Sequence, residues 1–253
     1  MTERSPEELA AFLKDVRLGR GETAPLDCGR AKASFHPAAC PQERAEELAR
    51  IANRPLPGFI LYKFGSRSIV GAYTLPDRSV AVLKYYYPSS PHKHLTYGIK
   101  GSRCQQSWVA AMGLRHIGVP TPAPLFIAEW QLLGGLWLSK SFLATDPAQG
   151  IPLDEFVSRN GTEHPLIEKI VQQLRQSFSR MARHRAVHGD LKANNILVSE
   201  TGDISFIDLD AVEFLLSPSA LRTRREKDRN RFMANWKKNP EALRLFADVF
   251  DEV

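Results

Sequence analysis

The stretch VHGDLKANNILVSETGDISFIDLD, residues 187–210, decides the fold expected for this chain of 253 residues. Two short apolar runs flank the sequence Glu-Thr-Gly-Asp, and this pattern predicts a β-hairpin. Because the chain runs up one strand and back along the other, Asn195 and Asp208 should end close together, with Asp190 nearby. The hairpin therefore gathers two acidic side chains and one amide at one end.

These three side chains suit a hard cation and a proton acceptor. Asn195 and Asp208 offer oxygen ligands, and Mg²⁺ bound this way usually also needs substrate phosphate. Asp190 can take a proton from an incoming hydroxyl. The order of these residues resembles the catalytic loop of the protein-kinase-like superfamily. The segment 188–195 stands where that superfamily has H-R-D-L-x-x-x-N, and Asp208 stands at its metal-binding Asp.

Strand patterns begin upstream at Phe59 and predict a hairpin whose turn holds Gly65 and Ser66. A third strand contains the run Val-Ala-Val-Leu-Lys, which ends in Lys84. In a kinase-like reading, Lys84 contacts the α- and β-phosphates of ATP, and the turn at Gly65 and Ser66 covers the phosphates. The alternatives are a solvated lysine at a strand end and an ordinary turn.

A helix is expected from Arg103 to His116, capped by Ser102. In kinases the corresponding helix carries a Glu that pairs with the strand lysine, but no Glu lies between Lys84 and Glu129 here. Two other segments are expected to lack regular structure. Residues 19–41 are rich in Gly, Pro and small residues, and residues 88–101 form a polar connection, either a solvated loop or a docking surface for an anionic acceptor.

The predicted fold is α+β and bilobal, with an N-terminal antiparallel sheet and one helix followed by a mostly helical C-terminal lobe. The expected domains are a helical extension over residues 1–55, an N-lobe over 56–145 and a C-lobe over 146–253 with a short basic tail. Helix patterns in the extension begin at a capping box of Ser5 and Glu8. The short tail leaves no room for the activation segment of a protein kinase that is regulated by loop phosphorylation.

Composition sets outer limits on the class of protein. The formal net charge of +6 is compatible with nucleic acid, an anionic lipid surface or phosphorylated substrates, and it selects none of them. No apolar run approaches the length of a membrane span, and the N-terminus lacks a signal-peptide core. We therefore expect a cytoplasmic protein, and the basic helix over residues 218–236 could hold it on an anionic membrane.

Residues 59–238 resemble the lipopolysaccharide core sugar kinases, the Kdo and heptose kinase family. The matching motifs are Gly118-Val-Pro-Thr-Pro, His188-Gly-Asp with Asn195, Ile207-Asp-Leu-Asp, and Lys227-Asp-Arg with Arg231-Phe and Asn235-Trp. The resemblance implies ATP and Mg²⁺ as cofactors and an inner-core sugar hydroxyl as acceptor, at the cytoplasmic face of the inner membrane and without nucleic acid.

The implied roles are Mg²⁺ binding by Asn195 and Asp208, proton acceptance by Asp190, phosphate orientation by Lys84 and charge neutralisation on the transferred group by Lys192. Two other classes of function stay open. One is a kinase of a protein or a small soluble metabolite, and the other is a non-catalytic pseudokinase, which the missing helix Glu favours.

Overall fold

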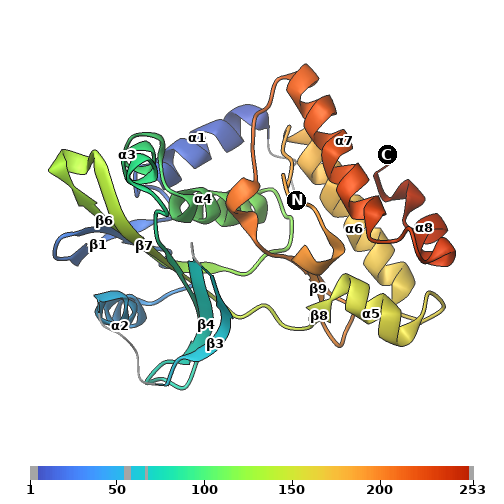
Figure 1. Ribbon diagram of the computed structural model, residues 1–253, viewed down its shortest axis with the longest axis horizontal. Helices are drawn as coiled ribbons and strands as arrows, with labels where there is room; N and C mark the ends of the chain where they lie inside the picture. Colours follow the sequence, from blue (N-terminus) through green and yellow to red (C-terminus); the bar gives the residue numbers. More distant parts are fainter. Residues whose placement is uncertain (1–4, 54–57, 66–67, 251–253) are drawn as a thin grey trace. The chain divides into compact units, whose positions relative to one another are not determined.

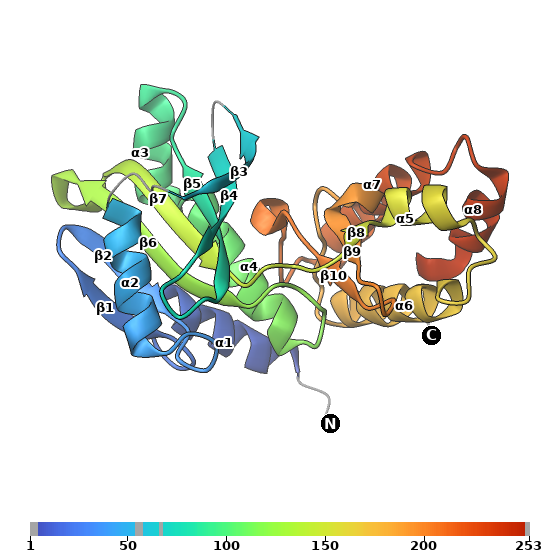
Figure 2. The same cartoon turned by 90° about the horizontal axis from the view of Figure 1, so that it is seen from below.

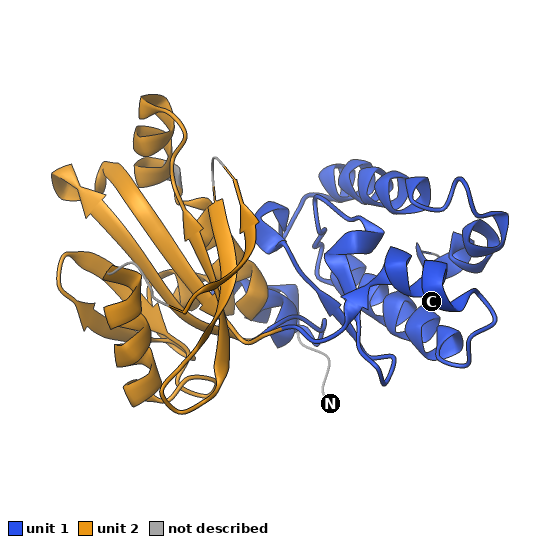
Figure 3. Ribbon diagram, turned by 60° about the horizontal axis from the view of Figure 1, so that its bottom comes forward, with its two compact units in different colours: residues 1–11, 113–122, 148–253 blue, residues 12–112, 123–147 orange. Residues whose placement is uncertain are grey.

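The computed structural model describes residues 5–53, 58–65 and 68–250 (Figures 1 and 2). The chain divides into two compact units, which Figure 3 draws in two colours. Unit 1 comprises residues 1–11, 113–122 and 148–253, and unit 2 comprises residues 12–112 and 123–147. Helices α1 (Pro6–Arg17) and α4 (Arg103–His116) contribute residues to both units.

Unit 2 is built on a seven-stranded antiparallel sheet in the order β1-β2-β6-β7-β5-β4-β3. Its elements are β1 (Ala24–Cys28), β2 (Ala31–Phe35), α2 (Gln42–Asn53), β3 (Ile60–Phe64), β4 (Ser68–Thr74), β5 (Val80–Tyr86), α3 (Pro91–Lys100), β6 (Pro124–Leu132), the turn η1 (Leu133–Gly135) and β7 (Trp137–Thr145).

Helices cover both faces of this sheet. Leu48 of α2 packs into a core with Leu83 and Phe142 on one face. Tyr86 points to the opposite face, because successive side chains alternate along a strand, and there its hydroxyl lies 2.9 Å from that of Ser107 in α4. Lys84 shares this second face with Tyr86, so the strand itself directs the lysine away from the core of α2.

Unit 1 is mostly helical, with a small antiparallel sheet in the order β10-β9-β8. Its elements are β8 (Ile151–Pro152), α5 (Leu153–Asn160), α6 (Ile167–Arg183), η2 (Ala193–Asn195), β9 (Ile196–Val198), β10 (Ile204–Phe206), η3 (Leu209–Ala211), α7 (Pro218–Ala234), α8 (Pro240–Leu245) and η4 (Ala247–Phe250). An aromatic core joins them, in which the ring of Phe178 lies 5.9 Å from Phe206, 6.1 Å from Phe232 and 4.4 Å from Phe250.

The predicted α+β class with an antiparallel sheet and a mostly helical second part is confirmed. Helix α4 has the predicted bounds, and the Oγ of its cap Ser102 accepts the backbone N–H of Gln105 at 2.9 Å. The capping box is also present, because Ser5 N donates to Glu8 Oε2 at 2.7 Å and Glu8 N donates to Ser5 Oγ at 3.2 Å. These features depend on neighbours in sequence, which is why the pattern alone predicts them.

Two expectations of irregular structure are wrong. Residues 19–41 contain β1 and β2, and β2 pairs with β6 to extend the sheet. In β2 the side chains of Ala31, Ala33 and Phe35 are buried while Lys32 is exposed, but small residues make this alternation weak in the sequence. Residues 88–101 contain helix α3, which begins after Ser90 with Pro91 in its first turn.

The domain boundaries at residues 55 and 145 stay a prediction. In the structure the chain passes from unit 2 to unit 1 after residue 147. Within the described ranges, no helix combines the length and the apolar character needed to cross a bilayer.

Candidate active site

The β9–β10 hairpin positions the predicted metal ligands in unit 1. Strand β9 pairs with β10, and beyond the last pair Ile207 N donates to Asn195 O at 2.9 Å. Asp208 follows Ile207 directly, so the backbone at Asn195 and at Asp208 is held at the same end of the hairpin. The structure thus brings these two residues together as the pattern of strands and turn predicted.

The segment Gly118–Pro122 holds the other edge of β10. Phe206 N donates to Pro120 O at 2.9 Å, and Thr121 Oγ1 donates to Phe206 O at 2.8 Å. This segment has little freedom, because proline fixes its own φ and restricts the residue before it. The Gly-Val-Pro-Thr-Pro motif therefore acts as a rigid edge that carries the strand leading to Asp208.

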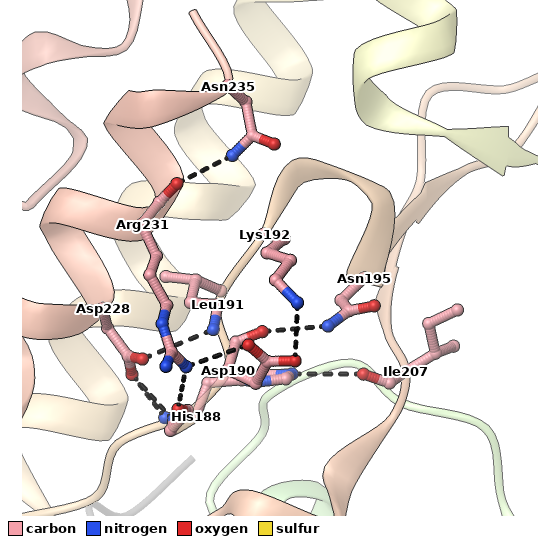
Figure 4. Close-up of polar contacts among 10 residues, drawn as sticks. His188, Asp190, Leu191, Lys192, Asn195, Ile207, Asp228, Arg231 and Asn235 are labelled. Atoms are coloured by element: carbon pink, nitrogen blue, oxygen red, sulfur yellow. Dashed lines mark hydrogen bonds and ion pairs between the residues drawn. The ribbon is translucent and has the colours of Figure 1, made fainter.

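The Asp190 carboxylate lies between two cationic side chains (Figure 4). Lys192 Nζ is 3.0 Å from Oδ2, and Arg231 Nη1 is 2.9 Å from Oδ1. Asn195 Nδ2 donates to the Asp190 backbone carbonyl at 2.9 Å. Because Nδ2 makes this bond, the amide oxygen of Asn195 faces away from Asp190 O. That oxygen is the atom of Asn195 that could coordinate a metal ion.

A buried carboxylate from α7 anchors the loop that carries Asp190. Asp228 is only 4% exposed, and its Oδ2 accepts the backbone N–H of His188 at 2.8 Å and of Gly189 at 3.0 Å. Its Oδ1 accepts from Leu191 N at 3.4 Å. A single side chain thus fixes the backbone before and after Asp190, which sets the direction of that side chain (Figure 4).

His188 links the loop, as a neutral ring, to the end of the hairpin that holds Asn195 and Asp208. Its Nε2 lies 3.1 Å from Ile207 O, so Nε2 carries the proton and donates. Burial lowers the pKa of His188, while the neighbouring Asp228 and Asp208 carboxylates oppose that shift. Its Nδ1 carries no proton in this tautomer and has no hydrogen-bond partner within the described part of the chain. The imidazole therefore fixes the distance between the loop and Ile207, the residue before Asp208.

Position 189 requires glycine because of its backbone conformation and the close approach of a neighbouring carbonyl group. Its φ is +81°, and a Cβ at this position would collide with the carbonyl oxygen of Ala211. No L-residue with a side chain fits there without a backbone shift. The absence of an arginine, which many regulated protein kinases carry at this position, thus has a steric cause in this chain.

Asp208 adopts the left-handed conformation, with φ 58° and ψ 57°. A non-glycine residue is rarely held there, and such strain concentrates at functional sites. Asn195 and Asp208 together provide one amide and one carboxylate, a donor set of oxygens that fits Mg²⁺ with substrate phosphate and water completing its shell. Among the residues that the structure describes, no group of three or more His, Cys, Asp or Glu side chains is arranged for metal binding.

Lys84 lies in unit 2, in register with Leu143 of β7 and Val70 of β4. Its Nζ is 5.0 Å from the centre of the Tyr86 ring. On the same face of the sheet, Ser107 of α4 is buried and hydrogen-bonded to Tyr86. A buried acid is present on the same face of the sheet at Glu129, whose partner in the structure is the Ser102 hydroxyl.

The turn between β3 and β4 is only partly described. Gly65 N donates to Ser68 O at 3.0 Å, and a Cβ at Gly65 would make an ordinary contact with that oxygen. Ser66 lies outside the described residues. The stricter need for glycine is at Gly71, where a Cβ would collide with the Ile60 carbonyl oxygen.

The roles of two residues of this site are not predicted from the sequence. Asp228 and Arg231 lie in one of the motifs that resemble the sugar kinases, but the composition of their helix predicts only a basic surface. A signal was available, because Asp228 is an acid in a strongly basic segment and Phe232, four residues later, lies on the same buried face of the helix.

The comparisons with known proteins agree with this geometry. Residues 80–243 match the model of the lipopolysaccharide kinase (Kdo/WaaP) family. The chain belongs to this family. The match covers more than half of the chain and includes Lys84 and the whole segment from the catalytic loop through α7, so the expectation of a phosphotransferase is confirmed at the level of the family.

Two relatives show how far the similarity extends. A solved structure of WaaP in complex with acyl carrier protein has a TM-score of 0.56 and 19% sequence identity, over 81% of this chain and 86% of that chain. Protein kinase kin1 of Schizosaccharomyces pombe is 36% identical over 74 residues, which are 29% of this chain and 8% of kin1. The first shows the fold of this Kdo/WaaP family member, and the second is similar over a small part of a much longer protein.

Proposed function

We propose that this Kdo/WaaP family member is an ATP-dependent kinase that transfers the γ-phosphoryl group to a sugar hydroxyl of the lipopolysaccharide inner core, on Kdo or heptose. The family supports the reaction class and the acceptor class. The observation that carries the proposal is the Asp190 carboxylate, held by an anchored loop beside the Asn195 and Asp208 pair.

In this proposal Asp190 accepts the proton of the sugar hydroxyl as that oxygen attacks phosphorus. Lys192 and Arg231 each pair with one of the two carboxylate oxygens, which favours one orientation of the carboxylate. Lys192 also neutralises charge on the transferred phosphoryl group. Most of the rate enhancement then comes from positioning and charge stabilisation.

We assign binding of the nucleotide phosphates to Lys84, Gly65 and Ser66, and binding of its metal ion to Asn195 and Asp208. Lys84 orients the α- and β-phosphates, and the turn at Gly65 and Ser66 covers them. Asn195 and Asp208 would hold Mg²⁺, which when bound neutralises phosphate charge and orients the transferred group. These roles rest on matching positions in the kinase-like motif and on the donor atoms of the side chains.

We assign the protein to the cytoplasm, at the anionic surface of the inner membrane, because the acceptor class is a lipid-linked saccharide. Helix α7 was expected to supply the contact, but several of its cations have partners inside unit 1. Arg224 pairs with Glu213 at 3.1 Å, Arg225 donates to Phe250 O at 2.6 Å, and Arg231 pairs with Asp190. The remaining charge of α7 supports attraction to the surface and does not define an inserted face.

The test is phosphoryl transfer from labelled ATP to purified core lipopolysaccharide, compared between three variants. Asp190→Ala should abolish transfer while nucleotide binding persists, and Asp208→Ala should weaken binding of Mg·ATP. Asp203→Ala is a matched control, because Asp203 lies on the same hairpin and pairs only with exposed groups. Normal turnover in Asp190→Ala would remove the assigned base, and unchanged nucleotide affinity in Asp208→Ala would remove the metal role.

Other acceptors separate the alternative classes. Labelling of casein or of an aminoglycoside, with core lipopolysaccharide left unlabelled, would make the chain a kinase of a protein or a small metabolite. Nucleotide binding without any transfer would make it a pseudokinase, in line with the missing helix Glu. The acyl carrier protein named with WaaP is a further candidate partner, which co-purification with a tagged form of this chain would test.

A further inference from the structure

In unit 2, helix α3 lies beside the strands β6 and β7 (Figures 1 and 2), and an apolar surface is formed where α3 packs on the turn between them. Five aliphatic side chains there are between 45% and 75% exposed. They form what we name the α3–η1 surface: Leu95, Ile99, Leu132, Leu133 and Leu136. Single exposed leucines are common on proteins, but five on two adjoining elements form a patch of the kind that marks an interaction site.

Close backbone packing makes these two elements one surface. A Cβ at Gly98 would collide with the carbonyl oxygen of Leu136, so α3 lies directly against the turn. His94 Nδ1 lies 2.6 Å from Leu138 O, and its ring stacks on Trp137 with 4.7 Å between centres. Leu95 and Ile99 are four residues apart and share one side of the helix next to this contact.

The backbone of η1 is shaped to present a leucine. Leu133 has φ +52°, in a region that a bulky side chain rarely adopts, and its side chain is 75% exposed. Gly134 and Gly135 follow with φ +66° and +96°. A strained backbone that places an apolar side chain in water is costly to the isolated protein, and such outliers point to a functional constraint.

The charge around this surface has one sign. The sequence contains no Asp or Glu in residues 85–128 or in residues 130–145. Among the cations of these segments that lie in unit 2 are Lys93, Arg103 and Lys140, and Lys140 Nζ donates to the Ala52 carbonyl oxygen of α2. The acid between the segments, Glu129, is 5% exposed and bound to Ser102, and Asp27 on β1 stands in register with Lys32. The apolar patch is therefore set in a positive field.

We propose that the α3–η1 surface docks on an anionic lipid bilayer, with its leucines and Ile99 entering the boundary between headgroups and acyl chains. Exposed aliphatic side chains flanked by Lys and aromatic rings are the composition of such interfacial contacts. The aromatic rings in the two segments 85–128 and 130–145 include the half-buried Tyr97 and Trp137. This inference rests on the proposed function for its biological setting, and its binding step needs no ATP and no acceptor.

The experiment is co-sedimentation of the full chain with vesicles of phosphatidylcholine, with and without phosphatidylglycerol. The double variant Ile99→Ser with Leu133→Ser should lose binding by about tenfold or more, because two apolar side chains no longer leave water. Lys93→Gln should weaken binding to the anionic vesicles by about fivefold and leave neutral vesicles unaffected. Leu18→Ser is the matched control, since Leu18 is 49% exposed and lies outside the surface.

Full binding by the double variant, or an equal loss in Leu18→Ser, would overturn the inference. The inference would also be overturned if the double variant still bound vesicles but no longer bound a protein partner, because the α3–η1 surface would then be a protein-binding surface. A second readout separates this inference from the proposed kinase. If the wild type phosphorylates deacylated core oligosaccharide but ignores vesicles, docking fails and the kinase stands. If the wild type binds vesicles through this surface but transfers no phosphate, the docking inference stands and the proposed kinase activity fails.

Discussion

Replacing Asp228 by Asn tests whether a remote carboxylate holds the catalytic loop in place. The substitution keeps the size of the side chain but removes its charge and one of its two acceptor oxygens. In the native protein these oxygens accept three backbone N–H groups, from His188, Gly189 and Leu191. The change therefore acts on the loop without touching any group proposed to meet substrate.

The expected magnitude follows from the hydrogen bonds. If the amide oxygen takes the place of Oδ2, the bonds from His188 and Gly189 remain but lose their charge assistance, which is worth about 1 kcal/mol each. Leu191 N then faces an NH₂ group, and an unsatisfied buried donor costs about 1–3 kcal/mol. Removing a buried charge recovers part of this. We expect the free energy of unfolding to fall by about 2–4 kcal/mol.

Two assays separate stability from positioning. Urea unfolding should show a lower midpoint with an unchanged slope. Under conditions where circular dichroism shows Asp228→Asn to be folded, kcat should fall by about a hundredfold, because a loop displaced by an ångström misplaces the base. KM for ATP should change little. Glu226→Gln, an exposed carboxylate-to-amide change on the same helix, is the control. Native stability and native kcat in Asp228→Asn would refute the anchoring role.

Three further predictions concern neighbouring features. Gly189→Ala should lower the free energy of unfolding by at least about 2 kcal/mol in thermal or urea unfolding, because the new methyl group meets a backbone carbonyl at positive φ; a stable, active variant would contradict the close approach. Burial raises the pKa of Glu129 above its ordinary value of 4.5, although the Ser102 hydroxyl opposes the shift. The folded state then holds the proton more tightly, so this contribution to stability is fully present below the unfolded pKa and is lost as pH rises from 4.5 through the raised folded pKa, and Glu129→Gln should unfold with less pH dependence in that range; parallel pH profiles would exclude this. Arg231→Ala should reduce kcat by about tenfold or more with an unchanged KM for ATP, because the Asp190 carboxylate loses one of its two ion-pair partners. A change in the KM for ATP alone would instead indicate that Arg231 contacts the nucleotide.

Features set by neighbouring residues in the sequence were predicted well. Helix α4 has the expected bounds, and the capping box of Ser5 and Glu8 forms as the spacing implies. The β9–β10 hairpin is also predicted from the sequence, because two apolar runs around a turn sequence favour antiparallel pairing. The register of this pairing brings Asn195 next to Asp208.

Features that depend on distant partners were missed. Strand β2 contains small residues whose alternation becomes meaningful only against β6, which lies about a hundred residues further on. The sequence of helix α3 predicts a polar connection, because its stability comes partly from packing of Gly98 on the turn at Leu136 and of His94 on β7. Tertiary packing overrides weak local preference in both cases.

By itself, the sequence determined the chemistry: which side chains can accept a proton or bind a cation, and the spacing that brings Asp190, Asn195 and Asp208 to one hairpin. Only the tertiary structure decided how Asp190 is held. From some forty residues away, Asp228 binds the backbone on either side of Asp190 and Arg231 pairs with its carboxylate, and no periodicity or local spacing records contacts of that kind. A helix places its side chains by its own geometry, but which backbone they meet depends on how the whole unit packs.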